Sequence, residues 1–516
     1  PTPPRMGNGV SVVSEETLRP VVPLAAPLPL SYADSSSAPS YIRVIVLYAV
    51  PGAEFEAAVG RLRAGLQRAL DGAPELGGAV VRRPDGAEVV AADEAGRSAG
   101  VGFTVQAAPY TSMADLALRD YALEALPDPL TQPVGMVAAV DPLVAVHVTK
   151  LGEDGLALGL SVHHYLADGG GLAALAAVWS AYSRGEDGGA LPLHRDRAVL
   201  QARATADLPS SAVLAYSEFG APDPAVPRYH REPPPGGGSF VALGMDARLR
   251  SRVWRLPKDA LAALRARAAA DAPPGAAPLS SNDVLSAWVW RCVSAARRLP
   301  PDTVTKLATA CDARARMTPP LPPGYLGNAN FAFMVESSAG DLAGRPLAAT
   351  AAAIRTRLAA VDESFVRAAM HWIGTLPHKC DVPVAFRCSY GPDVGITNWS
   401  RFPIYGANFG FGTPVRVRTP ASLHEGHVTI LPGDFAPDTT AAELVFNLAV
   451  DDMERLATVP DFVALLPAAA AALAAEFRRG GDTGDGVGGG GGGGMGGGVG
   501  VGGGSVAVAS GDASAT

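Results

Sequence analysis

The stretch His163-His164-Tyr165-Leu166-Ala167-Asp168-Gly169 marks a change from one backbone pattern to another. Before it, residues 156–162 alternate leucine and valine with alanine, glycine and serine, which predicts a buried strand. After it, residues 172–179 carry apolar side chains at helical spacing, and Gly185 ends that pattern. The histidines are therefore expected at a strand end, and the Asp-Gly pair in the turn that begins a helix. A histidine held there is well placed for proton transfer near neutral pH.

The strand pattern leaves the roles of these side chains open. Adjacent strand residues point to opposite faces, so only one of His163 and His164 can face a given cleft. If the strand continues to its end, His164 shares the face of the leucines, and the periodicity does not say which face meets substrate. Asp168 either orients His164 or turns away to pair with an arginine. An isolated His-x-x-x-Asp also fits a core histidine and a helix-capping aspartate. A metal site is disfavoured because no third ligand lies at a suitable spacing.

Length and composition limit the classes of protein to consider. The 516 residues are 48% hydrophobic and 18% charged, enough for two to four domains with a large core. A net charge of −8 argues against a nucleic-acid partner. We expect no membrane span, because no run of about 18 apolar residues is free of breakers, and residues 1–14 do not resemble a signal peptide. Four cysteines without zinc-like spacing favour a cytoplasmic protein with reduced thiols: Cys292, Cys311, Cys380 and Cys388.

Changes of pattern along the chain divide it into five parts. Residues 1–20 are expected to form an N-terminal tail, and the glycine-rich residues 480–516 a disordered one. Residues 21–200 and 239–479 are expected to be two domains, joined by a Pro-, Gly- and Ser-rich linker at 201–238. Strands and helices alternate loosely in both domains, which predicts an α/β fold with a cleft between them. Strands are expected at 41–50, 306–311 and 441–450, and helices at 55–70, 257–269, 281–298 and 451–456.

Four more segments follow the histidine motif: residues 281–292 (SNDVLSAWVWRC), 312–330 (DARARMTPPLPPGYLGNAN), 395–405 (GITNWSRFPIY) and 408–414 (NFGFGTP). In this order the chain resembles the BAHD acyl-CoA-dependent acyltransferases, from about residue 10 to about residue 466. The resemblance implies two chloramphenicol-acetyltransferase-like domains with a channel between them. Acyl-CoA would enter from one face and a small-molecule alcohol or amine acceptor from the other. It also implies a monomer with no permanently bound cofactor, acyl-CoA being a co-substrate.

The resemblance gives the first motif its roles. His164 matches the family's catalytic histidine, which takes a proton from the acceptor as that atom attacks the thioester carbonyl, with no acyl-enzyme. Asp168 matches an aspartate that turns away from substrate and pairs with an arginine, and Gly169 allows the turn. The stretch from Asp312 supplies the candidate partners, of which Arg314 is favoured over Arg316.

The second family signature, usually Asp-Phe-Gly-Trp-Gly, is altered here to Asn408-Phe409-Gly410-Phe411-Gly412. Asn408 can keep hydrogen bonds but not the ion pair of the family's aspartate. Phe411 keeps an aromatic plug without the indole N–H. We therefore expect the loop on the CoA side to keep its geometry, with an effect on stability and CoA affinity rather than on chemistry.

Further residues match the family's channel. Thr397 and Trp399 match residues that line it, and Thr397 is expected to hydrogen-bond the carbonyl or tetrahedral oxygen. Trp288 either shapes the acceptor pocket or only packs. Ser40 falls in a segment that forms the acceptor pocket of hydroxycinnamoyl-transferring relatives, but its neighbours differ from theirs. Most of the remaining histidines are expected to be surface or structural residues: His147, His194, His230, His371, His378, His424 and His427.

Two other functions compete with a stand-alone acyltransferase. A condensation-domain-like enzyme shares the His-His-x-x-x-Asp-Gly core but takes its donor from a carrier protein. An inactive binding protein on the same scaffold is mildly favoured by Asn408 and opposed by the intact His164 and Asp168. The segment 324–329 (GYLGNA) differs from that of malonyl-specific relatives, which leaves acetyl, longer acyl and hydroxycinnamoyl donors open.

Overall fold

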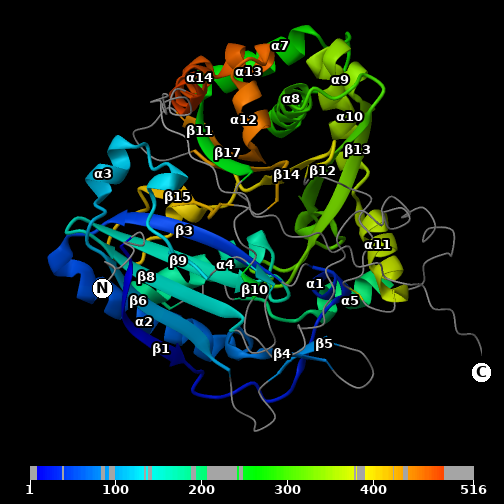
Figure 1. Cartoon of the computed structure of the whole chain (residues 1–516). Coiled ribbons are helices and arrows are strands. Elements are labelled where there is room, and N and C mark those ends of the chain that lie inside the picture. Colours follow the sequence, from blue (N-terminus) through cyan, green and yellow to red (C-terminus); the bar gives the residue numbers. More distant parts are fainter. Residues whose placement is uncertain are drawn as a thin grey trace, which may run out of the picture.

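Two six-stranded sheets, one centred in each half of the chain, form the framework of the protein (Figure 1). The structure is a computed structural model that describes residues 9–37, 40–82, 88–91, 99–132, 135–136, 142–187, 193–205, 241–242, 248–376, 379, 390–421, 424–433 and 440–481. Most of the expected linker 201–238 and nearly all of the expected tail 480–516 lie outside the described residues, as do residues 1–8 of the expected N-terminal tail.

The first sheet holds the strand that ends at the histidine motif. Its order is β1 (Ser11–Leu18), β6 (Val101–Ala108), β8 (Val144–Leu151), β9 (Gly155–His163), β3 (Tyr41–Ala49) and β15 (Arg416–Arg418). Helices α2 (Phe55–Gly72) and α4 (Gly169–Ser183) pack against each other and share one hydrophobic core with these strands. Strand β9 is buried along its whole length because it lies between β8 and β3 under this helical layer.

The second sheet has its own helical layer and core. Its order is β11 (Leu249–Pro257), β17 (Thr440–Ala449), β16 (His427–Pro432), β14 (Val394–Asn398), β12 (Val304–Asp312) and β13 (Asn330–Ser338). Helix α8 (Ser281–Ala296) is the most buried of the helices over it, and a capping box between Ser280 and Asp283 begins it. The surrounding helices are α7 (Lys258–Ala270), α9 (Ala339–Gly344), α10 (Leu347–Ala359), α12 (Val450–Leu456), α13 (Pro460–Leu465) and α14 (Pro467–Gly481).

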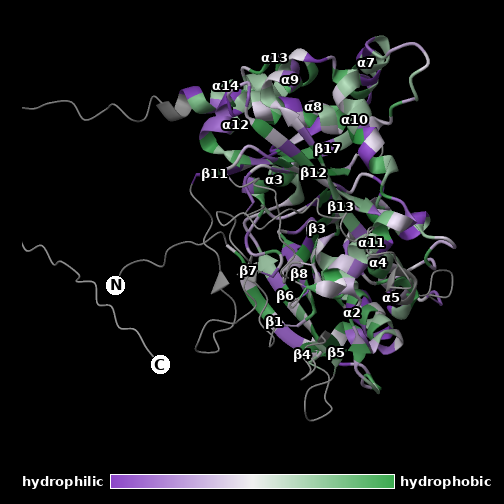
Figure 2. Ribbon diagram, turned by 90° about the vertical axis from the view of Figure 1, so that its right-hand side faces the viewer, coloured by the Kyte–Doolittle hydropathy of each residue, from purple (hydrophilic) through white to green (hydrophobic). Residues whose placement is uncertain are grey.

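Smaller elements complete the described parts of the chain. They include the strands β2 (Leu28–Pro29), β4 (Ala79–Arg82), β5 (Glu88–Ala91), β7 (Gly135–Met136) and β10 (Val241–Ala242), and the helices α1 (Tyr32–Ser35), α3 (Met113–Leu118), α5 (Ala198–Thr205) and α11 (Glu363–Thr375). Outer helices such as α7 and α10 carry both hydrophilic and hydrophobic residues along their length (Figure 2), as expected for helices with one buried face. None of the helices in the described ranges is long and apolar enough to cross a membrane.

A segment from the second half of the chain crosses into the first sheet. Strand β15 pairs antiparallel with β3, and the preceding residues Trp399, Ile404 and Phe409 belong to the core of the first sheet. The Tyr48 hydroxyl donates a hydrogen bond to the carbonyl of Ala407 at 2.8 Å. The first sheet therefore includes one strand from the second half of the chain.

The strands and helices expected from periodicity are present, with ends shifted by a few residues. One segment differs from expectation, because residues 11–18 form β1 rather than part of a tail. All but the last of the side chains in β1 lie outside the core, so the strand has no hydrophobic alternation in sequence. Its pairing with β6 rests on backbone hydrogen bonds, which leave no pattern of residue types to detect.

We predict that Gly159→Ala lowers stability, because a Cβ at Gly159 in central strand β9 would lie 1.7 Å from the Leu130 carbonyl oxygen. Overpacking of this kind costs about 1–3 kcal/mol. The measurement is the midpoint of urea unfolding. Gly60→Ala is the matched control, because a Cβ there meets nothing within 4 Å on the exposed side of α2, so this variant should gain up to about 1 kcal/mol. Equal midpoints for both variants would contradict the prediction.

Candidate active site

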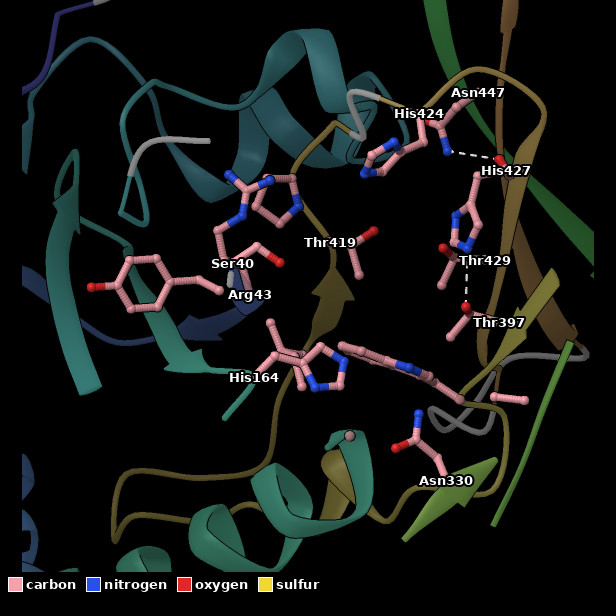
Figure 3. Close-up of a pocket in the computed structure, with 16 residues that line it drawn as sticks. Ser40, Arg43, His164, Asn330, Thr397, Thr419, His424, His427, Thr429 and Asn447 are labelled. Carbon is pink, nitrogen blue, oxygen red and sulfur yellow. Dashed lines mark hydrogen bonds between the residues drawn. The ribbon is translucent and has the colours of Figure 1, made fainter. Parts of the chain in front are cut away.

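A cavity of about 370 Å³ lies where the two halves of the chain meet (Figure 3). Its wall includes Ser40 and Arg43 at the start of β3, and His164 just after β9. The second half contributes residues from β14, β16, β17 and the 419–424 segment, namely Thr397, Trp399, Thr419, Pro420, His424, His427, Thr429 and Asn447. The cavity is therefore formed by side chains from both halves of the chain, which are far apart in the sequence.

The two adjacent histidines have different surroundings. His163 ends β9 and is buried, and its Nδ1 accepts a hydrogen bond from the backbone N–H of Tyr165 at 3.0 Å. The backbone N–H of His164 donates to the carbonyl of Ser40 at 2.9 Å, and its ring lines the cavity. At the end of β9 the side chain of His163 therefore lies in the core, whereas that of His164 faces the cavity.

Asn328 determines which nitrogen of His164 carries the proton. The Asn328 amide nitrogen donates to the His164 carbonyl at 2.6 Å and to the Asp34 carboxylate at 2.9 Å, so its amide oxygen is the atom 2.9 Å from His164 Nδ1. An amide oxygen only accepts hydrogen bonds, so Nδ1 of His164 carries a proton. In the neutral ring Nε2 is then the nitrogen with the lone pair, which is the form a general base needs.

A buried ion pair holds Asn328 in this orientation. Asp34 is fully buried, and its Oδ1 accepts from the backbone N–H of Asn328 at 2.8 Å and from Arg197 at 3.0 Å. Arg197 also donates to the Leu166 carbonyl at 2.7 Å, inside the histidine turn. Sequence reasoning missed Asn328, Asp34 and Arg197. Only the capping-box pair Ser31 and Asp34, which begins α1, left a recognisable signal.

Asp168 supports the turn from the other side. It is the N-cap of α4, accepting from the Gly171 N–H at 2.9 Å, and it faces Arg314 at 2.7 Å and 3.0 Å. It also accepts from the backbone N–H of Ala329 at 2.9 Å. Burial alone would raise the pKa of the Asp168 carboxyl, but the charge and hydrogen bonds of Arg314 outweigh it and lower the pKa. Arg316, the other candidate, donates instead to the carbonyls of residues 358 and 361.

Two other expected supports flank this pair. Asp312, half exposed, accepts from the backbone and guanidinium of Arg314 at 2.9 Å and 3.1 Å. A Cβ on Gly169 would lie 2.6 Å from the ring of Phe402, so the absence of a side chain there allows the turn to approach the segment after Trp399.

The far wall of the cavity is more polar than the sequence indicated. The Thr397 hydroxyl lies 3.0 Å from His427 Nε2, and both residues line the cavity (Figure 3). Burial lowers the pKa of His427 to about 4, so its ring is neutral at pH 7. His424 lines the same wall, whereas these two belonged to a group of histidines most of which were expected to be surface or structural residues. Their short segment 424–427 has no periodicity that would have placed it at the site.

Trp288 and the altered second signature lie in packed regions. Trp288 is fully buried in the second core, stacks on Phe462, and does not line the cavity. Phe409 is buried against Trp179, with ring centroids 4.8 Å apart.

The rest of the second signature forms a tight turn. Phe411 packs edge-to-face on Tyr48 at 5.0 Å. The Asn408 side chain accepts from the Gly410 N–H at 2.8 Å, and Gly410 and Gly412 have positive φ angles of 96° and 103°, which side chains strain. Asn408 thus satisfies the turn without an ion pair.

The Asp168–Arg314 pair should make stability depend on pH. Its lowered folded-state pKa means that its contribution is present above about pH 4, the unfolded value, and is lost as pH falls further. We predict that Asp168→Asn, which leaves Arg314 with only the half-exposed Asp312 as a charged partner, costs about 3–5 kcal/mol at pH 7 and progressively less below pH 4. Thermal unfolding across this pH range measures it.

The control for that series is Asp312→Asn, which removes a half-exposed partner of the same arginine and should cost less than about 1 kcal/mol. A penalty for Asp168→Asn that is the same at every pH would contradict the assignment of the pair.

Comparisons with known proteins agree with this architecture. The profile described as "Transferase family" matches residues 9–462. A hydroxycinnamoyl-CoA:5-hydroxyanthranilate N-hydroxycinnamoyltransferase of Avena sativa is 31% identical over 406 residues, covering 77% of this chain and 84% of the relative. A hydroxycinnamoyltransferase of Narcissus pseudonarcissus is 32% identical over 303 residues, 56% of this chain and 63% of the relative, so that match spans less than two thirds of the relative's length.

Solved structures share the fold at low sequence identity. TRI101 of F. sporotrichioides, solved with coenzyme A and T-2, superposes with a TM-score of 0.70 at 20% identity, covering 85% of this chain and 99% of that one. Vinorine synthase superposes with a TM-score of 0.60 at 19% identity, covering 89% and 98%. The expected two-domain fold is confirmed. Because the family profile covers most of the sequence, the chain belongs to this transferase family, the BAHD acyl-CoA-dependent acyltransferases.

Proposed function

We propose that this protein transfers an acyl group from acyl-CoA to a hydroxyl or amine of a small molecule, with both substrates bound at once and His164 as general base. The single observation that carries the proposal is the hydrogen bond between His164 Nδ1 and the Asn328 amide oxygen, which in the neutral ring makes Nε2 the nitrogen that can accept a proton in the cavity. The base takes the acceptor's proton as the acceptor atom attacks the thioester carbonyl. CoA then leaves as the tetrahedral intermediate collapses, and the proton on Nε2 passes to its sulfur.

Thr397 is proposed to stabilise the oxygen of the tetrahedral intermediate. Its hydroxyl has one proton, so donation to the oxyanion requires Thr397 Oγ1 to accept from His427 Nε2. Neutral His427 can supply that hydrogen from Nε2. The Thr397 hydroxyl proton is then available to the oxyanion. A preorganised donor of this kind is worth about 10²–10³-fold in rate.

The relatives suggest where to search for substrates. Several curated relatives are named for hydroxycinnamoyl transfer, to acceptors that include shikimate, 5-hydroxyanthranilate and putrescine. A hydroxycinnamoyl-CoA is therefore the first donor to test here, together with acetyl-CoA and longer acyl-CoAs. Both hydroxyl and amine acceptors belong in the panel.

The proposal predicts that His164→Ala lowers turnover about 10²–10⁴-fold, because the acceptor loses its base. The assay is free-thiol release from each acyl-CoA in the presence of mixed alcohols and amines, with wild type and variant compared. Thiol release must require an acceptor. His163→Asn, which alters the buried neighbour and can still accept from Tyr165, is the matched control and should keep most of the activity if it folds.

Other outcomes of this assay have defined meanings. Equal activity of wild type and His164→Ala would overturn the role given to His164. Inactivity with every acyl-CoA, followed by activity with an acyl group on a carrier protein, would support the condensation-type reaction instead. Binding of acyl-CoA without turnover would support an inactive binding protein.

Asn328 should act as a positioning residue. We predict that Asn328→Ala lowers kcat about tenfold or more with little change in KM, because the ring of His164 is then no longer held in one tautomer. Steady-state kinetics and the pH profile of kcat measure it, and the acidic limb of that profile should move. Ser37→Ala removes a weaker contact to the same amide oxygen, at 3.2 Å, and should leave kcat nearly unchanged. A rise in KM alone would contradict this role.

A further inference from the structure

Arg43 lies in the wall of the cavity at a position where the strand is otherwise apolar. On β3 it shares a face with Ile45 and Leu47, which pack in a small hydrophobic cluster with Leu130 and Leu126. Its register partner on β9 is Ser161. A guanidinium group on this face is not explained by core packing, because a leucine or valine would fit the pattern better.

The guanidinium of Arg43 lacks a matching anion in the described parts of the chain. Its one hydrogen bond is to the Gln132 carbonyl at 3.4 Å, and no carboxylate there lies within 4.0 Å. Asp128 acts on it from farther away. Burial lowers the pKa of Arg43 to about 10, and Asp128 only partly offsets that effect. A largely buried cation without a paired anion lowers the stability of the fold, so an anion that binds Arg43 should offset part of that cost.

Among the described residues that line the cavity, Arg43 is also the one formally charged side chain. The rest of the polar lining consists of hydroxyl, amide and imidazole groups, among them Ser40, Thr419 and Asn447. Burial leaves His427 neutral at pH 7, so it adds no second positive charge. An anion that entered this cavity would therefore meet a single cation with most of its five N–H donors free.

We propose that Arg43 binds a carboxylate on the acceptor substrate, so that the acceptor is a small carboxylic acid whose hydroxyl or amine is acylated at His164. The inference rests on the proposed function and adds the chemical class of the acceptor. The planar fork of a guanidinium matches the two oxygens of a carboxylate, which makes the contact directional as well as charged. The surrounding hydroxyl and amide groups suit further hydroxyls on the same acid.

The position of Arg43 argues against CoA phosphates as its partner. Tyr41 pairs with His163, and Arg43 is two residues farther along β3, which is about 7 Å at the spacing of a strand. When the thioester carbonyl lies at His164, the pantetheine arm keeps the phosphates of CoA well beyond this distance. A group that reaches Arg43 while the thioester lies at His164 belongs either to the acceptor or to the acyl chain of the donor, and the KM measurements below distinguish the two.

The first test needs no catalysis and uses benzoate and benzamide, which differ in charge but hardly in shape. Benzoate should raise the melting temperature of the wild-type protein more than benzamide does at the same concentration, and this difference should disappear in Arg43→Gln and persist in Arg43→Lys. Equal effects of the two probes on wild type would overturn the proposal. So would a lower melting temperature of the empty Arg43→Gln protein, which would make Arg43 a structural residue.

The second test uses turnover with hydroxylated acids, each paired with its own methyl ester. Wild type should prefer the acid over the ester at least tenfold in kcat/KM, and Arg43→Gln should lose this preference through a rise in KM for the acid. Arg250→Gln, in the adjoining cavity that Arg43 also borders, is the matched control and should keep the preference. A KM effect on acyl-CoA in place of the acceptor would overturn the proposal.

The two tests separate failure of this inference from failure of the proposed function. No turnover with any acceptor, together with a charge-dependent benzoate effect, would mean that the function is wrong while the anion site stands. Turnover with acids and esters alike would mean that the function stands and the anion site is wrong.

Discussion

Two buried carboxylates, one on each side of a short backbone segment, hold the turn that carries His164 in place. Asp34 accepts the N–H of Asn328, and Asp168 accepts the N–H of Ala329. Each carboxylate also faces an arginine, Arg197 and Arg314 respectively. The segment between them carries the amide that contacts the His164 ring, so the ring is oriented by contacts that begin with two ion pairs.

These ion pairs are better understood as positional devices than as sources of stability. Removing two charges from water costs several kcal/mol per ion, and the attraction between them returns that cost only with good geometry and further hydrogen bonds. Here the further bonds go to backbone groups of the loop, since Arg314 also donates to the Gly327 carbonyl at 2.8 Å and Arg197 to that of Leu166. The buried ion pairs therefore fix the conformation of these loops through hydrogen bonds to the backbone, which apolar side chains in the same places could not make.

The sequence allowed some of this to be predicted and not the rest, for physical reasons. The strand and helix around His164 follow from local periodicity, and Asp168 and Arg314 lie in motifs with recognisable residues. Asp34 and Arg197 act across the fold on a segment near residue 328, and nothing in their neighbouring sequence records that contact. The same is true of β1, which depends on backbone pairing, and of His427, whose burial and neutral state come from its surroundings in three dimensions.

Both halves of the chain contribute side chains to the cavity, and a strand crossing joins them. The first sheet carries His164 and Arg43, while the second carries Thr397 and the segment that holds Asn328. The contact between His164 and Asn328 therefore joins side chains from the two halves. The crossing of β15 into the first sheet, with Phe409 buried beside Trp179, ties the two halves by backbone pairing and packing. The altered signature keeps this tie because its aromatic rings, rather than an ion pair at Asn408, make the contact.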